Sequence, residues 1–245
     1  GTPKQVETGP GTAAWVPFGA ISKFMTTAVL TTEDGGFYRH RGFDAEAIRN
    51  SLRENLRKRK FVRGASTISM QLAKNVYLDR TKNLSRKLQE AVLTMYLEQV
   101  LTTDQIMELY LNVIEYGPRL YGIGPAAYHF FGKKPKELTP VEAAFFSTIL
   151  PSPKERYKQY CAGTLTKWTT GKIERILQIM HKRDRLTDAE YEAAIDTPLV
   201  FARDGADESE EDCMKRVKKA IKNARPTNPL ADRASPVSAP APAPA

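Results

Sequence analysis

The sequence predicts a mostly α-helical domain. Thr102, Thr139 and Thr187 each stand three residues before a glutamine or a glutamate, a spacing that lets two side chains satisfy exposed backbone N–H groups at a helix start. Apolar residues then recur every three or four positions, as one buried helix face requires. Because no sustained alternation of apolar and polar residues competes with this pattern, strands are expected to contribute little.

Earlier helices are expected from the same signals. Asp44 is placed to cap one helix and Ser66 to cap the next. The apolar faces of these two helices and of a third are made by Ile48, Leu52 and Leu56, by Ile68, Leu72 and Val76, and by Leu88, Val92 and Met95.

The chain divides into three parts. Residues 1–14 are expected to be a linker at which a missing membrane anchor would attach, and residues 15–202 to form the folded domain. Residues 203–245 are charged and then rich in proline and alanine. That composition cannot bury a core, so they are expected to form a disordered tail.

The composition describes a globular protein that prefers anions. The chain has 245 residues, a mean hydropathy of −0.44 and a net charge of +9, which favours phosphates, an anionic membrane surface or nucleic acid. Seven basic residues lie between Arg49 and Arg63, against one acid, Glu54. This run fits a solvated helix face or a contact with lipid headgroups, whereas its single aromatic residue, Phe61, offers little stacking surface to nucleic acid.

Several familiar sites are missing from the sequence. It contains no run of about 18 apolar residues that would cross a membrane, no histidine pair at metal-ligand spacing and no glycine-rich phosphate loop. Cys161 and Cys213 match no zinc or redox spacing. They are either two thiols or, outside the cytoplasm, one disulfide.

Two carboxylates and three cations suggest a reaction in which a sugar hydroxyl attacks and a pyrophosphate leaves. Glu33 is suited to take the proton of an attacking sugar hydroxyl. Lys74, Arg86 and Lys87 are suited to neutralise a departing pyrophosphate, which needs positive charge rather than a proton. Glu90 lies three and four residues after Lys87 and Arg86, so these three side chains meet on one side of a helix. Taken alone, such a group is more typical of a solvated ion-pair face.

Other polar residues near Glu33 also have ordinary explanations. Glu33-Asp34 fits an exposed helix end before a Gly-Gly turn. Ser66-Thr67 fits a helix cap, which is compatible with substrate binding. A lone residue such as His40 is more often a packing residue than a catalyst.

Together these segments resemble the peptidoglycan glycosyltransferases, both the monofunctional biosynthetic transglycosylases and the glycosyltransferase domain of bifunctional penicillin-binding proteins. Five family motifs occur in family order, and the resemblance covers about residues 15–153. The matching segments are Glu33–Asp44 (Glu-Asp-x-x-Phe-x-x-His-x-Gly-x-Asp), Gly64–Asn75, Arg86–Glu90 (Arg-Lys-x-x-Glu), Ile106–Asn112 and Tyr121–Lys133. No Ser-x-x-Lys tetrad of a transpeptidase occurs in this sequence.

The resemblance implies a lysozyme-like glycosyltransferase fold with a large helical lobe and a smaller membrane-facing lobe, so that residues 15–202 would be a glycosyltransferase domain. It implies that lipid II is polymerised into β-1,4-linked glycan strands, with inversion and release of polyprenyl pyrophosphate. The implied place is the extracytoplasmic face of the bacterial cytoplasmic membrane. Implied partners are lipid II, the growing glycan chain, an anionic membrane surface and other cell-wall synthases, but no nucleic acid.

The resemblance also assigns roles by position. Glu33, as general base, and Glu90 would be catalytic. The substrate-binding residues would be Asp34, Phe37, His40, Ser66, Thr67, Gln71, Lys74, Arg86 and Lys87. The sequence requires no cofactor, but a divalent cation (Mg or Mn) is compatible with it, with Glu90 as candidate ligand. Met70 departs from the family by replacing the first glutamine of a Gln-Gln pair, which removes an amide.

Two other functions stay open. A lysozyme-like glycan-cleaving enzyme would need a protonated carboxyl acid, a role for which Glu90 beside two cations is poorly suited. A catalytically degenerate module would bind peptidoglycan or a membrane through its basic face without turnover.

Overall fold

The computed structural model describes residues 9–60, 64–77, 84–202 and 208–222. Over these ranges the chain is mostly helical, with one small antiparallel sheet, which confirms the predicted fold class. The elements are α1 (Lys23–Thr32), α2 (Ala45–Lys58), α3 (Ile68–Tyr77), α4 (Leu84–Val100), α5 (Thr103–Val113), β1 (Glu115–Gly117), β2 (Leu120–Tyr121), α6 (Ile123–Phe131), α7 (Pro140–Ile149), α8 (Pro153–Arg156), α9 (Lys158–Ala162), α10 (Lys167–Lys182), α11 (Asp188–Asp196) and α12 (Glu210–Lys222), with short 3-10 turns at Phe18–Ala20, Phe37–Arg39 and Pro135–Glu137.

The helix starts follow the predicted capping chemistry with one exception. The boxes at Thr102, Thr139 and Thr187 are all formed, and Asp44 caps α2 by accepting from Ala47 N at 2.8 Å. The predicted cap at Ser66 is wrong. Because α3 begins at Ile68, the side chain that reaches the third helical N–H is that of Thr67, which accepts from Met70 N at 3.2 Å.

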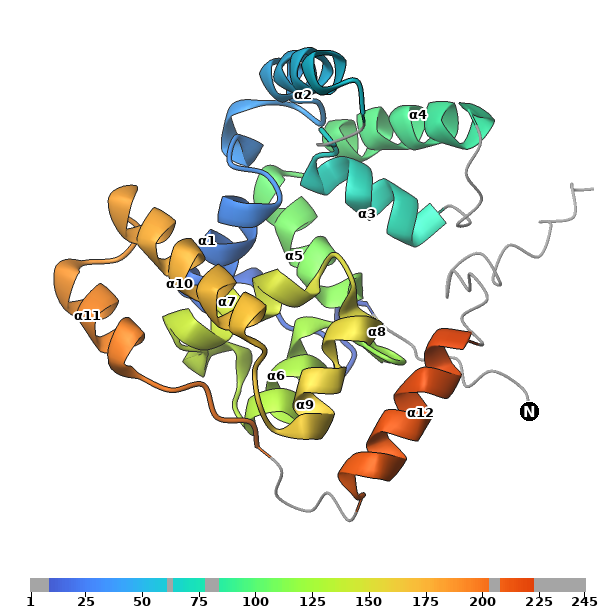
Figure 1. Ribbon diagram of the computed structural model, residues 1–245. Helices are drawn as coiled ribbons and strands as arrows, with labels where there is room; N and C mark the ends of the chain where they lie inside the picture. Colours follow the sequence, from blue (N-terminus) through green and yellow to red (C-terminus); the bar gives the residue numbers. More distant parts are fainter. Residues whose placement is uncertain (1–8, 61–63, 78–83, 203–207, 223–245) are drawn as a thin grey trace, which may run out of the picture.

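The molecule has a large and a small lobe. Figure 1 shows α2, α3 and α4 together at one end, and we call this group the small lobe. In the large lobe α7 is the central helix, buried from Val141 to Ile149, and α1 and α10 pack against it. Since α3 packs against α5 of the large lobe, and α4 makes a smaller contact with the same helix, α3 is the main link between the two lobes.

The small lobe presents an apolar face to solvent. Leu88, Val92 and Met95 follow the predicted helical spacing on α4, yet they are 63%, 60% and 50% exposed. Leu52 and Leu56 of α2 are 59% and 76% exposed. Periodicity predicted both faces correctly but could not say that the fold leaves them uncovered. Over the described ranges, every helix is too short or too polar to span a bilayer.

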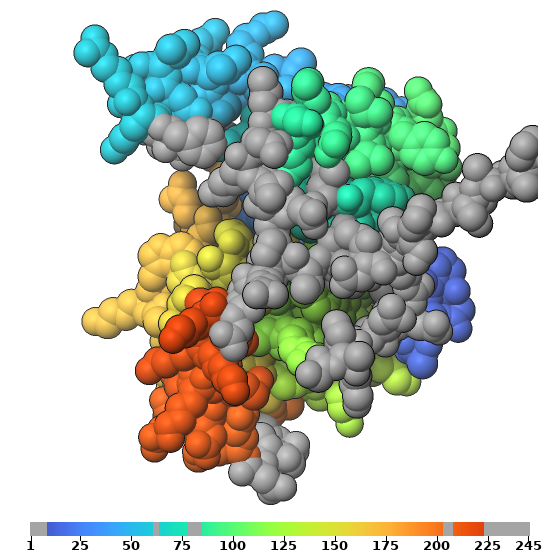
Figure 2. All heavy atoms as spheres, turned by 90° about the vertical axis from the view of Figure 1, so that its right-hand side faces the viewer, coloured from blue at the N-terminus to red at the C-terminus, as the bar shows by residue number. Residues whose placement is uncertain are grey.

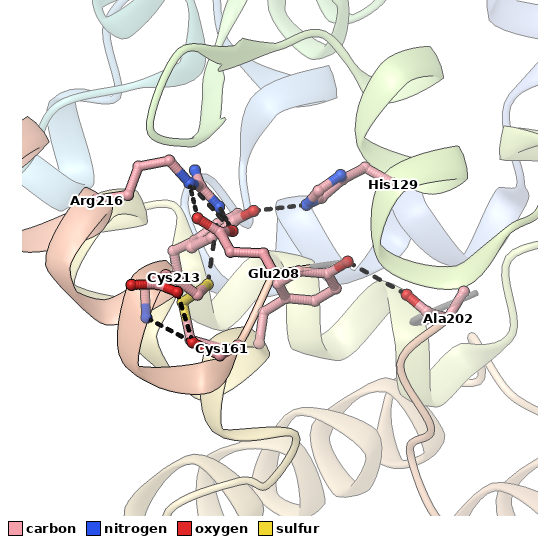
Figure 3. Close-up of a disulfide and its surroundings, with 10 residues drawn as sticks. His129, Cys161, Ala202, Glu208, Cys213 and Arg216 are labelled. Carbon is pink, nitrogen blue, oxygen red and sulfur yellow. Dashed lines mark hydrogen bonds and ion pairs between the residues drawn. A yellow bond between two sulfur atoms is a disulfide. The ribbon is translucent and has the colours of Figure 1, made fainter. Parts of the chain in front are cut away.

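The chain after residue 202 corrects the prediction of a wholly disordered tail. Residues 208–222 include α12, which packs on α8 and α9 and buries Cys213 and Val217. A disulfide joins Cys213 to Cys161 of α9, and Arg216 binds Glu208 at 2.7 Å beside it (Figure 3). Figure 2 shows α12 lying along the large lobe, away from the small one. Residues 1–8, within the expected linker, and residues 203–207 and 223–245 lie outside the described residues.

Candidate active site

Glu33 ends α1 with a partly exposed side chain. Its Oε2 accepts a hydrogen bond from Gln71 Nε2 of α3 at 2.8 Å. The carbonyl oxygen of the same amide accepts from the Tyr110 hydroxyl of α5 at 3.2 Å. Side chains from α5, α3 and the end of α1 therefore form one hydrogen-bonded chain that ends at the Glu33 carboxylate.

Asp34, the residue after Glu33, holds the framework together. It is buried, with His40 Nε2 at 3.0 Å from one carboxylate oxygen, while the other oxygen accepts from Ile68 N at 3.1 Å. A carboxylate at the first turn of a helix is favoured by the helix dipole. Asp34 thus fixes the segment after Glu33 to the start of α3.

Three further residues of the predicted substrate-binding set differ in access. Phe37 is buried, with its ring edge-on to His40 at 6.4 Å between centroids. Thr67 is buried, and its hydroxyl donates to Gly42 O at 2.6 Å while it caps α3. Ser66 is exposed. Phe37 and Thr67 therefore support the site from the protein interior, whereas Ser66 is accessible to a ligand.

The predicted cation cluster on α4 is formed. Glu90 is buried, its Oε2 pairs with Arg86 Nη1 at 3.1 Å, and its Oε1 pairs with Lys87 Nζ. The Lys87 side chain remains 46% exposed and that of Arg86 17%. Because one buried carboxylate faces two cations, the group keeps a net positive charge at the surface of α4.

Helix α3 connects this cluster to Glu33. It packs against α4 on one side and α5 on the other, and a buried hydrogen bond from Ser69 Oγ to Glu98 of α4 fixes that contact. Lys74 lies three residues beyond Gln71 on the same helix, a little less than one turn. The fold thus brings the segments with the proposed base and the proposed cations into one neighbourhood.

A metal site would have to draw on residues that already have partners. Among the described residues, Asp34, His40 and Asp44 form the one group of three whose candidate ligand atoms lie within 4.8 Å of one another. The hydrogen bonds of Asp34 to His40 and Ile68 and the cap made by Asp44 account for this grouping without an ion. Glu90 fits a divalent cation poorly, because its two oxygens already face Arg86 and Lys87. A role for Mg or Mn stays a prediction.

Tyr110 is the site residue that motif reading did not single out. Its side chain is buried, and burial, followed by the negative charge of Glu33, raises the pKa of its phenol well above the usual value. The phenol therefore stays protonated and can donate to Gln71. The sequence signal was present, since Tyr110 stands in the fourth motif, but it was also compatible with a plain core residue.

A family model described as transglycosylase matches residues 4–181, a range that contains α1, α3, α4 and α5. The chain belongs to the transglycosylase family. The match ends at residue 181, before α12.

Several relatives of this chain are named biosynthetic peptidoglycan transglycosylases. The biosynthetic peptidoglycan transglycosylase of Nitrosomonas eutropha is 44% identical over 140 residues, which are 57% of this chain and 57% of that protein. The protein of Nitrosospira multiformis is 39% identical over 163 residues, which are 66% of this chain and 69% of that protein. The protein of an Azoarcus species is 42% identical over 146 residues, which are 60% of this chain and 63% of that protein. The matches with the Nitrosomonas and Azoarcus proteins thus leave more than a third of those relatives uncovered.

Among solved structures, penicillin-binding protein 1A of Haemophilus influenzae matches this transglycosylase with 24% identity and a TM-score of 0.35. The match covers 55% of this chain and 16% of that one.

Met70, which replaces a glutamine of the family motif, has a buried side chain. Met70 is 7% exposed, but it lies outside the apolar core cluster to which Ile68 and Leu72 of the same helix belong. The side chain that replaces the family's glutamine is therefore buried, and Gln71, the next residue, is the one that reaches Glu33.

Proposed function

We propose that this chain is a peptidoglycan glycosyltransferase that polymerises lipid II into β-1,4-linked glycan strands with inversion, using Glu33 as the general base. The observation that carries the proposal is the Glu33 carboxylate, partly exposed and held by Gln71 on the helix that also bears Lys74. A carboxylate held in a fixed orientation can take the proton of an acceptor hydroxyl as that oxygen attacks the anomeric carbon.

The leaving group would be a polyprenyl pyrophosphate, which departs as an anion. Lys74, Arg86 and Lys87 are suited to bind it, since fixed positive charge stabilises the negative charge that develops as the bond breaks. Glu90 would act by holding Arg86 and Lys87 in place rather than by transferring a proton, because both of its oxygens face cations. Lys87, with the more exposed side chain, is the better placed of the two to contact phosphate.

The small lobe would rest on the membrane that carries the substrate. Helices α2 and α4 lie at the same end of the molecule in both views (Figures 1 and 2), and each carries exposed apolar side chains. Exposed arginines and lysines accompany them on α2 and just after it: Arg49, Arg53, Arg57, Lys58, Arg59 and Lys60. Apolar side chains among basic ones are typical of contact with an anionic lipid surface. The proposed place of action is the extracytoplasmic face of the cytoplasmic membrane, with other cell-wall synthases as candidate partners.

Polymerisation of purified lipid II in detergent tests the proposal, with glycan products separated on a gel. The parent chain is expected to give a ladder, and the Glu33→Gln variant none. Glu174→Gln is the matched control, because it makes the same change at an exposed carboxylate of α10. A ladder from Glu33→Gln equal to that of the parent would overturn the role of Glu33, and the absence of product from the parent would favour a degenerate binding module.

A further inference from the structure

We infer that Tyr110 and Gln71 act as a pair that positions the Glu33 carboxylate, so that Oε1 is the oxygen that receives the proton. The inference rests on the proposed function, since it assigns roles around the same general base. Gln71 was expected to bind substrate, and Tyr110 had no expected role at the site. Both would be positioning residues that act through Glu33.

Tyr110 determines the orientation of the Gln71 amide. A primary amide has an accepting and a donating end of nearly equal size, so its partners decide which end points where. The buried, protonated Tyr110 phenol donates to Oε1 of Gln71 at 3.2 Å, which turns Nε2 toward Glu33. The flipped amide would place its carbonyl oxygen against the carboxylate. Tyr110 thus selects the orientation in which Gln71 is a donor to Glu33.

The two oxygens of the Glu33 carboxylate differ in their hydrogen bonds. Thr32 Oγ1 lies 3.4 Å from Glu33 Oε1, and its one proton is also within reach of Val29 O at 3.4 Å and of the Ser147 hydroxyl at 2.5 Å. Oε2, by contrast, accepts the 2.8 Å hydrogen bond from Gln71. Because the contact of Oε1 with Thr32 is long and shared, Oε1 is the less strongly held of the two oxygens. We therefore assign Oε1 as the oxygen that meets an acceptor hydroxyl.

A pair of matched tyrosine variants tests the inference. Tyr110→Phe removes the donor to Gln71, and Tyr116→Phe removes an equally buried phenol that donates to Leu111 O at 3.3 Å. With lipid II as substrate, Tyr110→Phe is expected to lower kcat about five- to tenfold, the effect of one lost neutral hydrogen bond, with KM within about twofold. Tyr116→Phe is expected to keep both constants within about twofold of the parent. Equal effects of the two variants on kcat would overturn the inference.

A double variant asks whether Tyr110 acts through Gln71. Gln71→Met keeps the length of the side chain but removes its donor, and it should lower kcat more than Tyr110→Phe does. Adding Tyr110→Phe to Gln71→Met should then change kcat by less than about twofold, because the phenol has no amide left to orient. Full multiplication of the two losses would show that Tyr110 acts by another route.

The positioning can also be observed without turnover. In nitrogen-15-labelled protein the side-chain amide protons of Gln71 are expected to exchange slowly, and to exchange faster in Tyr110→Phe but not in Tyr116→Phe. If the parent made no glycan, the proposed function would fail while this measurement still decided the inference. Unchanged exchange in Tyr110→Phe would contradict it.

Discussion

The carboxylate of Asp34 accepts the backbone N–H of Ile68 at 3.1 Å, so the residue next to the proposed base also fixes the first turn of α3. Helix α3 carries Gln71, whose amide returns to Glu33 at 2.8 Å. The segment that holds the base and the helix that orients it are thus joined at two points. Small changes at Asp34 should therefore reach Glu33 through the position of α3.

Replacement of Asp34 is expected to cost both stability and turnover. Asp34→Ala leaves His40 and the Ile68 N–H without their buried acceptor, a loss of about 1–3 kcal/mol in the free energy of unfolding. Asp34→Asn keeps one carbonyl acceptor and should lose less. Chemical denaturation measures the stabilities, and lipid II polymerisation the activities. If Asp34→Ala were as stable as Asp34→Asn, the buried hydrogen bonds would not hold α3 in place.

Reduction of the Cys161–Cys213 disulfide is expected to destabilise the protein. The two cysteines are 52 residues apart, and closing a loop of that length restricts the unfolded chain by up to about 4 kcal/mol. The measured loss of stability should be smaller if α12 detaches from α8 and α9 before the rest of the protein unfolds. Thermal unfolding with and without a dithiol reductant measures it, and the Cys161→Ser/Cys213→Ser variant is the control, since reductant should not alter its melting. An equal effect of reductant on this variant would show that the loss has another cause.

Stability should fall as the pH drops below about 6.5 because of His129. Burial, followed by the nearby Arg216 charge, lowers the pKa of His129 from 6.5, and its Nε2 lies 2.7 Å from the Tyr157 hydroxyl. A folded-state pKa below the unfolded one means that this contribution is present above pH 6.5 and is lost as the pH falls through the lowered value. Melting temperatures between pH 7 and pH 5 should fall less steeply in His129→Gln than in the parent. Parallel curves for the two proteins would argue against His129 as the cause.

Charges placed on the exposed apolar face of α2 should weaken membrane binding without unfolding the protein. Leu52→Glu and Leu56→Glu alter side chains that are 59% and 76% exposed, so the free energy of unfolding should change by less than about 0.5 kcal/mol. Co-sedimentation with vesicles rich in anionic lipid should fall severalfold. Val200→Glu, at a 71% exposed position of the large lobe, is the control and should bind like the parent. Equal loss in the control would point to charge alone rather than to the small lobe.

Local chemistry was predictable from sequence, and long-range contacts were not. Asp44 and Thr102 could be identified as caps because a cap depends on residues two or three positions away. Whether Ser66 or Thr67 caps α3 depends on which residue begins the helix, and the pattern of the sequence does not fix that start to within one residue. The pairing of Cys161 with Cys213 could not be read from spacing, because the distance between them depends on how α12 packs on α9.

The site shows the same division. The Glu90 cluster was predictable from helical spacing, because Arg86 and Lys87 lie within one turn of it. The role of Gln71 was not, since its partners come from α1 and α5. Motifs nominated candidate site residues, but only the fold separates the exposed ones from those, such as Phe37, that lie in the core.

The most direct test of the central claim counts the ends of glycan strands. The chain would be incubated separately with lipid II and with preformed glycan strands, and both reducing ends and strand length would be measured. A transferase lengthens strands from lipid II and leaves preformed strands intact, and this is the result we expect. New reducing ends and shorter products from the preformed strands, with none lengthened from lipid II, would contradict the account and identify a glycan-cleaving enzyme.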